Sequence, residues 1–210
     1  MKLYLIRHGE TDWNKVRRLQ GQSDIPLNDF GRKLAMETAP ALRDVPFDLA
    51  ITSPLLRAKE TAELVLAGRN VPMREEPRLM ELAFGEYEGL ICKGEQCNIT
   101  DPDFHYFHDA PDKYVPPRGG ESFYDLQRRL KSFLEELFAD PALQDATILI
   151  STHGGVMCML FTLFKGRPLA EMWGHGVHKN CGVSLVEVKD GEPKVIFENR
   201  TFYSENVEDW

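Results

Sequence analysis

Short apolar segments alternate with longer amphipathic segments along most of this 210-residue chain. Strands are predicted at residues 2–6, 47–51, 147–151, 182–188 and 194–198. Helices are predicted at residues 27–43, from 53 to about 66, at 122–138, and directly after residue 155. Alternation of this kind places helices on both faces of a sheet. The expected fold class is α/β, a three-layer sandwich around a mostly parallel central sheet.

Several residues indicate where these elements begin and end. Asn28 and Ser53 are expected to be helix N-caps, and the proline after Ser53 suits the first helical position. Gly68 is expected to end the second helix. Asp190-Gly191 predicts a tight turn between the last two strands.

Residues 90–120 differ from the rest of the chain. They show little periodicity and contain two adjacent prolines and the aromatic run FHYFH at 104–108. Long irregular segments in compact domains are often lids or binding loops. We therefore expect a single domain over residues 1–210, with a lid-like insertion at about 90–120 that covers a substrate.

The charge balance limits the kinds of partner. The chain has 25 Lys and Arg against 33 Asp and Glu, a formal net charge of −8, and no long basic run. Broad electrostatic binding to nucleic acid or to an anionic membrane is therefore not expected. An anionic ligand needs a local pocket of positive charge instead.

Other composition features predict an ordinary cytoplasmic protein. No apolar run could span a bilayer, and the apolar start is too short for a signal-peptide core. The cysteines are expected to be free thiols; they are Cys92, Cys97, Cys158 and Cys181. Two HxxH pairs, at 105–108 and 175–178, have a zinc-like spacing but lie in expected loops, so no metal is predicted. The oligomeric state stays open, with a dimer as one option.

Two of the predicted strands end in the same way. One is followed by Arg7-His8-Gly9 and another by Thr152-His153-Gly154. In open α/β sheets, ligands bind beyond the carboxyl ends of the strands. The two histidines are therefore candidates for one site.

The segment RHGETDWN at residues 7–14 has the chemistry of an anion site next to a nucleophile. Arg7 carries a planar, permanently charged fork that suits phosphate oxygens. Gly9 is expected to let the backbone approach a ligand closely. Asn14 supplies a neutral donor nearby, and His8 carries the candidate nucleophilic nitrogen.

Four motifs together resemble the histidine phosphatase superfamily, a phosphoglycerate mutase-like group of enzymes. They are RHGETDWN at 7–14, SPLLRAKETA at 53–62, ELAFGEYEG at 81–89 and STHGG at 151–155. They occur in the family's order and span nearly the whole chain. The resemblance implies a phosphoglycerate mutase-like fold and phosphoryl transfer on a small phosphorylated metabolite.

The resemblance also implies a role for each matching residue. His8 would be phosphorylated and Glu81 would be the general acid and base. The residues that would hold the phosphoryl group are Arg7, Arg57 and His153, with further contacts from Asn14 and the Gly154 amide. Gln20 and Gly21 would contact the rest of the substrate. Glu88 is assigned a structural or rim role, and His178 or Lys179 is a further candidate for substrate contact.

Elementary chemistry agrees with these roles. A neutral imidazole can attack phosphorus if its other ring nitrogen donates to a backbone carbonyl, which sets the tautomer. The transferring phosphoryl oxygens need fixed positive donors. Arg7, Arg57 and a protonated His153 are expected to supply them, so we predict a metal-independent phosphomonoesterase that needs no cofactor.

Two other functions are weighed against a phosphatase. A cofactor-dependent phosphoglycerate mutase would use the same catalytic set. Mutases of the family usually carry a basic, tyrosine-containing run after the acid glutamate, whereas this chain has LAFGEYEGL, which favours the phosphatase branch. A non-catalytic binder of phosphorylated ligands is disfavoured because every expected catalytic residue is present.

Overall fold

The protein is described by a computed structural model, which covers residues 1–174 and 176–205. Its described residues form a six-stranded sheet in the order β3-β2-β4-β1-β5-β6. The strands are β1 Lys2–Arg7, β2 Leu49–Thr52, β3 Met73–Glu75, β4 Thr147–Thr152, β5 Val183–Lys189 and β6 Glu192–Arg200. The pairs β1–β4, β2–β4 and β2–β3 are parallel, and β1–β5 and β5–β6 are antiparallel. The predicted mostly parallel sheet is confirmed, and β3 is an additional short strand at its edge.

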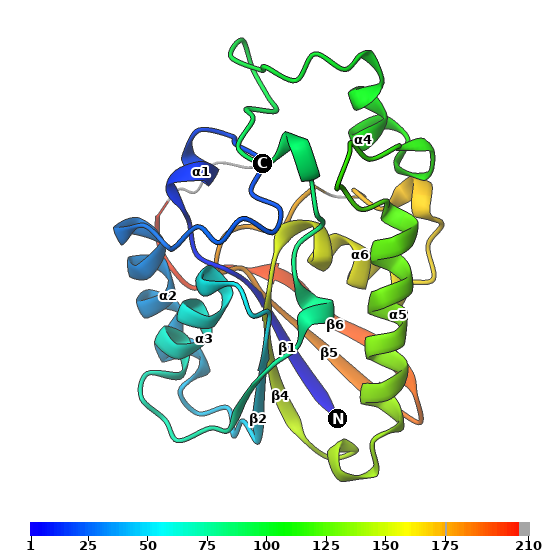
Figure 1. Cartoon of the computed structure of the whole chain (residues 1–210). Coiled ribbons are helices and arrows are strands. Elements are labelled where there is room, and N and C mark those ends of the chain that lie inside the picture. The colour runs from blue at the N-terminus through cyan, green and yellow to red at the C-terminus, as the bar shows by residue number, and fades with distance from the viewer. Residues whose placement is uncertain (175, 206–210) are drawn as a thin grey trace.

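Helices cover both faces of this sheet (Figure 1). On one side lie α2 Asp29–Leu42 and α3 Leu56–Leu66, and on the other lie α5 Phe123–Ala139 and α6 Gly154–Phe164. The short helices α1 Asp12–Lys15 and α4 Tyr106–Asp109 lie near the upper end in this view. The three-layer α/β fold class is therefore confirmed.

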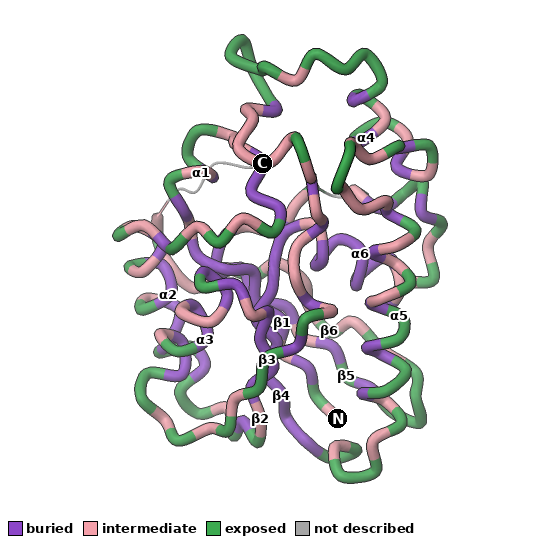
Figure 2. The backbone as a smooth tube through the Cα atoms, in the orientation of Figure 1, coloured by how far each residue is buried: buried purple, intermediate pink, exposed green. Residues whose placement is uncertain are grey.

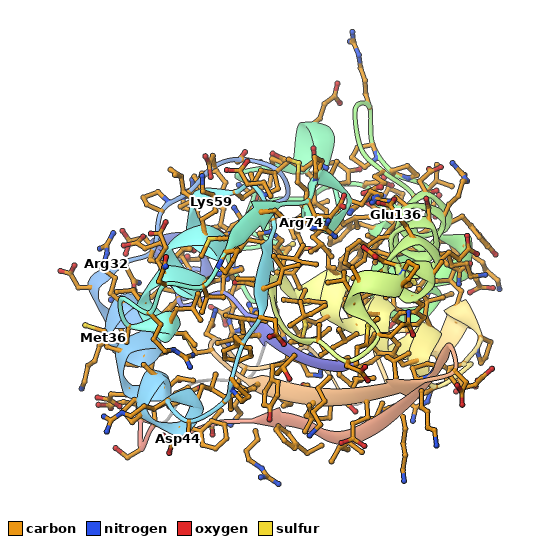
Figure 3. The ribbon with its side chains drawn as sticks, turned by 90° about the horizontal axis from the view of Figure 1, so that it is seen from below. Arg32, Met36, Asp44, Lys59, Arg74 and Glu136 are labelled. Carbon is orange, nitrogen blue, oxygen red and sulfur yellow. The ribbon has the colours of Figure 1, made fainter. Side chains whose placement is uncertain are left out.

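Two apolar layers hold the helices against the sheet. The layer under α2 and α3 includes Ile6 and Leu149, and the layer under α5 and α6 includes Leu5 and Ile150, all with no exposed surface. Neighbouring residues of one strand thus alternate between the two faces. Figure 2 shows the central strands buried and the outer loops exposed. Charged side chains on the helices, such as Arg32 and Glu136, point outward (Figure 3).

The helix caps and the turn predicted from the sequence are confirmed in part. Asn28 caps α2, because its side chain accepts a hydrogen bond of 2.7 Å from the Gly31 amide. Asp190 and Gly191 have φ values of 53° and 79°, as the predicted turn requires. The prediction for Ser53 is wrong, since α3 has Leu55 as its N-cap and no side-chain cap bond. Ser53 instead contacts a histidine of the site described below.

The segment at 90–120 is exposed at residues 93–98 and packs against the body of the protein through its later aromatic residues. Besides α4 it contains 3-10 turns at Pro102–His105 and Pro111–Lys113. Its side chains Phe104, Phe107 and Tyr114 are buried in the core layer that includes α5. In the described residues, no helix is long and apolar enough to cross a membrane.

Removal of the α2 cap is expected to destabilise the fold. In Asn28→Ala the Gly31 amide loses its acceptor, so the free energy of unfolding should fall by about 1 kcal/mol. Asn28→Ser keeps an oxygen acceptor at this position and should retain most of that stability. Urea unfolding followed by circular dichroism measures both variants, and equal losses would contradict the capping role.

Candidate active site

A cavity lies where β1 and β4 end. These neighbouring parallel strands pair Arg7 with Thr152, and the His8 amide donates to the Thr152 carbonyl at 2.9 Å. The next residue after each strand is a histidine, so the rings of His8 and His153 lie with centroids 5.2 Å apart. The residues predicted for the site that line the cavity are Arg7, His8, Asn14, Gln20, Gly21, Arg57, Glu81 and Gly154. His153 lies behind them, fully buried.

His8 has the geometry of a neutral nucleophile. Its Nδ1 lies 2.6 Å from the Gly9 carbonyl, which selects the tautomer with the proton on Nδ1 and leaves Nε2 with its lone pair. His8 as a whole residue is 3% exposed. Burial and the charges of Arg57 and Arg7 hold its pKa well below the usual range. The imidazole is therefore neutral at physiological pH.

Arg7 and Arg57 place two buried guanidinium groups at the cavity. Arg7 Nη1 donates to the His178 carbonyl at 2.5 Å, and Arg57 donates to the carbonyls of Ser23 and Gly21 at 2.8 and 2.7 Å. Burial lowers the pKa of each to about 10, so both stay charged at neutral pH. The Nε of each is buried without a hydrogen-bond partner. Backbone carbonyls thus fix the orientation of both groups without neutralising their charge.

His153 is held from the side by Ser53. Its Nε2 lies 2.7 Å from Ser53 Oγ, and its Nδ1 is buried without a partner. Burial and the positive charge of Arg57 hold its pKa well below the usual range. In the site without a ligand, the lowered pKa favours a neutral His153, in contrast to the protonated ring expected beside a phosphoryl group. If the Ser53 hydroxyl donates to Nε2, then Nδ1 carries the hydrogen and acts as a neutral donor.

Glu81 reaches the start of α6. Its carboxylate accepts hydrogen bonds from the amides of Leu82, Gly155 and Val156 at 2.9, 3.0 and 3.2 Å. The latter two amides belong to the first turn of α6, where the helix dipole favours a negative group. A Cβ at Gly155 would lie 2.8 Å from Glu81 Oε1, so a side chain there would displace the carboxylate.

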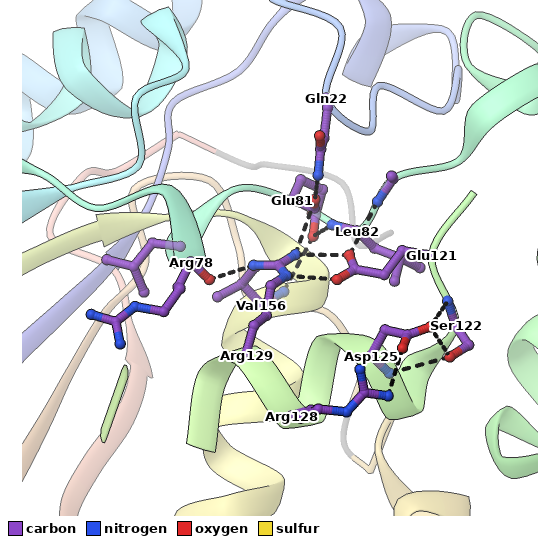
Figure 4. A network of polar contacts seen from close by, with 12 residues as sticks. Gln22, Arg78, Glu81, Leu82, Glu121, Ser122, Asp125, Arg128, Arg129 and Val156 are labelled. Atoms are coloured by element: carbon purple, nitrogen blue, oxygen red, sulfur yellow. Dashed lines mark hydrogen bonds and ion pairs between the residues drawn. The ribbon is translucent and has the colours of Figure 1, made fainter. Parts of the chain in front are cut away.

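Arg129 of α5 fixes the main chain that carries Glu81 (Figure 4). Its Nη2 donates to the Glu81 carbonyl at 3.2 Å, and its Nη1 donates to the carbonyl of Arg78. The same guanidinium forms a bidentate ion pair with the carboxylate of Glu121, in which Nε and Nη2 donate at 2.7 and 2.9 Å. Gln22 also donates to the Glu81 carbonyl, at 3.3 Å. The backbone of Glu81 is thereby held between α5 and the loop at residues 20–23.

The other predicted contacts have clear local causes. Asn14 Oδ1 accepts from Thr11 in the capping box of α1, which leaves its Nδ2 for the cavity. Gln20 Oε1 is buried without a partner. Gly21 has φ of 51°, and a Cβ there would lie 2.1 Å from Glu88 Oε1. Glu88 itself accepts from the amides of Gln22, Ser23 and Phe84, which agrees with a structural role for this residue.

The prediction for Gly9 is wrong, and of the pair His178 or Lys179 the structure removes the ring of His178 as a candidate for substrate contact. Gly9 does not line the cavity; its lack of a side chain serves close packing on α2, since a Cβ would lie 2.6 Å from the Gly31 carbonyl. His178 is buried, its Nε2 lies 3.1 Å from Glu198, and its ring is not part of the cavity wall. Its contribution is the backbone carbonyl that holds Arg7.

Sequence reasoning missed several residues of the site. Ser53, Asn180 and Arg129 were not assigned a part in it, although Asn180 donates to the His8 carbonyl at 2.9 Å. The further cavity-lining residues are Arg18, Leu19, Leu82, Phe84, Phe107, His108, Gly155, Trp173 and Val177. Leu82, Phe84 and Gly155 lie inside motifs already singled out from the sequence. Phe107, His108, Trp173 and Val177 lie outside those motifs, and only the contacts between distant parts of the chain bring them to the cavity.

The described residues contain no group of three or more His, Cys, Asp or Glu side chains that could hold a metal ion. His175, one half of an HxxH pair, lies outside the described residues. The four cysteines are free, as predicted.

Comparisons with known proteins give the family. The profile of the histidine phosphatase superfamily (branch 1) matches residues 3–201. An adenosylcobalamin/alpha-ribazole phosphatase of Salmonella typhimurium is 32% identical, over 91% of this chain and 92% of the relative. A relative in Escherichia fergusonii named "Probable phosphoglycerate mutase GpmB" is 30% identical, over 91% and 87%. The solved structure of Bacillus stearothermophilus YhfR superimposes with a TM-score of 0.87 at 38% identity, covering 94% and 96%.

The buried neutral histidines predict a protein that loses stability in acid. As the pH falls below about 6.5, the unfolded chain protonates these imidazoles, whereas the folded chain does not because their pKa values are lowered. The unfolded state then binds more protons, so stability should fall with pH by up to about 1.4 kcal/mol per pH unit for each histidine.

His153→Gln tests this prediction. The free energy of unfolding, measured in urea at about pH 7.5 and about pH 5.5, should drop less in the variant than in the parent. His105→Gln removes an exposed imidazole and serves as the control, which should keep the parental drop. A parental drop in His153→Gln would contradict the assignment.

Proposed function

This chain belongs to the histidine phosphatase superfamily, and from that premise we propose that it is a metal-independent phosphomonoesterase of small phosphorylated metabolites. The reaction proceeds through a phosphohistidine on His8, with Glu81 as general acid and base. The observation that carries the proposal is the free Nε2 of a neutral His8, next to two buried arginines that have uncommitted Nε atoms. A cytoplasmic location remains a prediction from the sequence.

In the first step His8 Nε2 attacks phosphorus in line with the ester oxygen. The N–P bond forms as the P–O bond breaks, and the leaving alkoxide takes a proton from protonated Glu81. Nδ1 keeps its proton throughout, because it donates to the Gly9 carbonyl. The charge that spreads over the phosphoryl oxygens is stabilised by Arg7, Arg57 and a hydrogen on His153 Nδ1.

In the second step water attacks the phosphorus of phosphohistidine. Glu81, now a carboxylate, accepts a proton from this water, and the N–P bond breaks to restore the His8 lone pair. Inorganic phosphate leaves and Glu81 is again protonated. The amides of Gly155 and Val156 stabilise the carboxylate between the two steps.

A phosphoglycerate mutase is the second candidate. It would need a cation for the substrate carboxylate, and Arg18 is a third arginine on the cavity wall. Its Nε is buried without a hydrogen-bond partner. The phosphatase is preferred because six other side chains that line the cavity are apolar or aromatic rather than basic. Interconversion of 2- and 3-phosphoglycerate faster than phosphate release would reverse this order.

Loss of the nucleophile tests the proposal directly. His8→Ala should lower phosphate release from a test ester by about 1000-fold or more, since no nitrogen remains to accept the phosphoryl group. The wild-type protein, quenched in turnover with 32P-labelled ester, should carry an acid-labile label that the variant lacks. Activity should persist in EDTA. Full activity in His8→Ala, or a demand for a divalent metal, would contradict the proposal.

Arg129 should act on the reaction through Glu81. In Arg129→Met the Glu81 carbonyl loses a donor and Glu121 loses its partner, so the carboxylate is held less firmly. We expect kcat for an alkyl phosphate to fall about tenfold with little change in KM. A p-nitrophenyl ester needs little help from a general acid, so its phosphorylation step, measured as a burst, should be spared. Arg128→Met, on the exposed side of α5, is the matched control. Equal losses for both esters would indicate a structural role only.

A further inference from the structure

Part of the cavity wall has no task in phosphoryl transfer. Six lining side chains are apolar or aromatic, and they come from four separate segments of the chain: Leu19, Leu82, Phe84, Phe107, Trp173 and Val177. Four of them are at most 7% exposed. This surface, which we call the apolar wall, is where the alcohol part of an ester would lie once its phosphoryl group is at His8.

The apolar wall is held in place by contacts among its own members. The ring centroid of Phe107 lies 5.5 Å from that of Phe84 and 5.0 Å from that of Trp173. Trp173 Nε1 donates to the Phe107 carbonyl at 2.5 Å, which satisfies the indole and ties the 90–120 segment to the loop before β5. The wall is therefore formed before any ligand binds, so a ligand loses little binding free energy to the ordering of these side chains.

Polar groups near the apolar wall are few. The polar side chains around the phosphoryl position already have roles in the proposed reaction. Beyond them, the polar side chains that line the cavity are Arg18, Gln20 and His108, and Gln20 Oε1 and Arg18 Nε are buried without hydrogen-bond partners. A sugar or polyol would bury several hydroxyl groups against rings and methyl groups that cannot hydrogen-bond to them. An aromatic or alkyl body would instead remove apolar surface from water on both sides.

We propose that the substrates of this enzyme are phosphomonoesters whose alcohol carries an aromatic or other apolar body with few polar groups. The inference rests on the proposed phosphatase function and adds the class of leaving alcohol. Polyol phosphates and sugar phosphates are then poor substrates, because most of their hydroxyl groups would lie against the apolar wall without partners.

A matched pair of esters tests the class. Both 2-phenylethyl phosphate and glycerol 3-phosphate are esters of primary alcohols, so the basicity of the leaving oxygen is similar. A difference in kcat/KM between them therefore reports the contact of the alcohol with the apolar wall. We expect kcat/KM to be at least about tenfold higher for the phenylethyl ester. Equal values, or a preference for the glycerol ester, would overturn the inference. Failure to release phosphate from either ester, with no labelled enzyme, would contradict the proposed function instead.

A small change in the wall should alter this preference. Val177→Thr keeps the side-chain shape and adds a hydroxyl to the wall, so the ratio of the two kcat/KM values should fall about threefold or more. Val195→Thr makes the same change at a half-buried residue of β6 outside the cavity, and the ratio should match the wild type. An unchanged ratio in Val177→Thr, or an equal fall in Val195→Thr, would overturn the assignment of the wall.

Discussion

The parallel pairing of β1 with β4 is the interaction on which the site depends. Its register sets Arg7 beside Thr152, so the residue that follows each strand is a histidine at the same edge of the sheet. The hydrogen bond from the His8 amide to the Thr152 carbonyl extends this pairing one residue into the site. A slip of one residue would turn these side chains to the other face. The apolar layers on both faces therefore also specify the active-site geometry.

The second constraint is the burial of positive charge. Arg7 and Arg57 are at most 4% exposed, and among the described ion pairs neither has a carboxylate partner. Carbonyl groups hold them, and Glu81 attracts them only through space. A buried charge without a neutralising partner is unfavourable in the empty site. In the proposed reaction, a dianionic phosphoryl group would remove this deficit on binding, and the same two charges would stabilise the transition state.

The sequence predicted well what depends on neighbouring residues. The strand ends at His8 and His153 follow from local periodicity, and so does the cap at Asn28. The error at Ser53 shows the limit: next to a proline it has every local feature of a cap, but its partner is one hundred residues away at His153. The position of Arg129 near Glu81 depends in the same way on the packing of α5. Periodicity along one helix cannot report such contacts.

The residues after the central strands and the residues of the apolar wall lie in different parts of the fold, and this separation affects how enzymes of this kind can diverge. His8 and His153 directly follow central strands, whereas Phe107 and Trp173 lie in segments that connect strands. Trp173 joins these two segments through its hydrogen bond to the Phe107 carbonyl and through ring contacts with Phe107 and His108. Connecting segments tolerate insertion and replacement better than core strands do. A descendant gene could therefore acquire a new leaving alcohol by exchanging these two segments together. The chemical step would be inherited unchanged, and exchange of one segment alone would leave the other without its contacts.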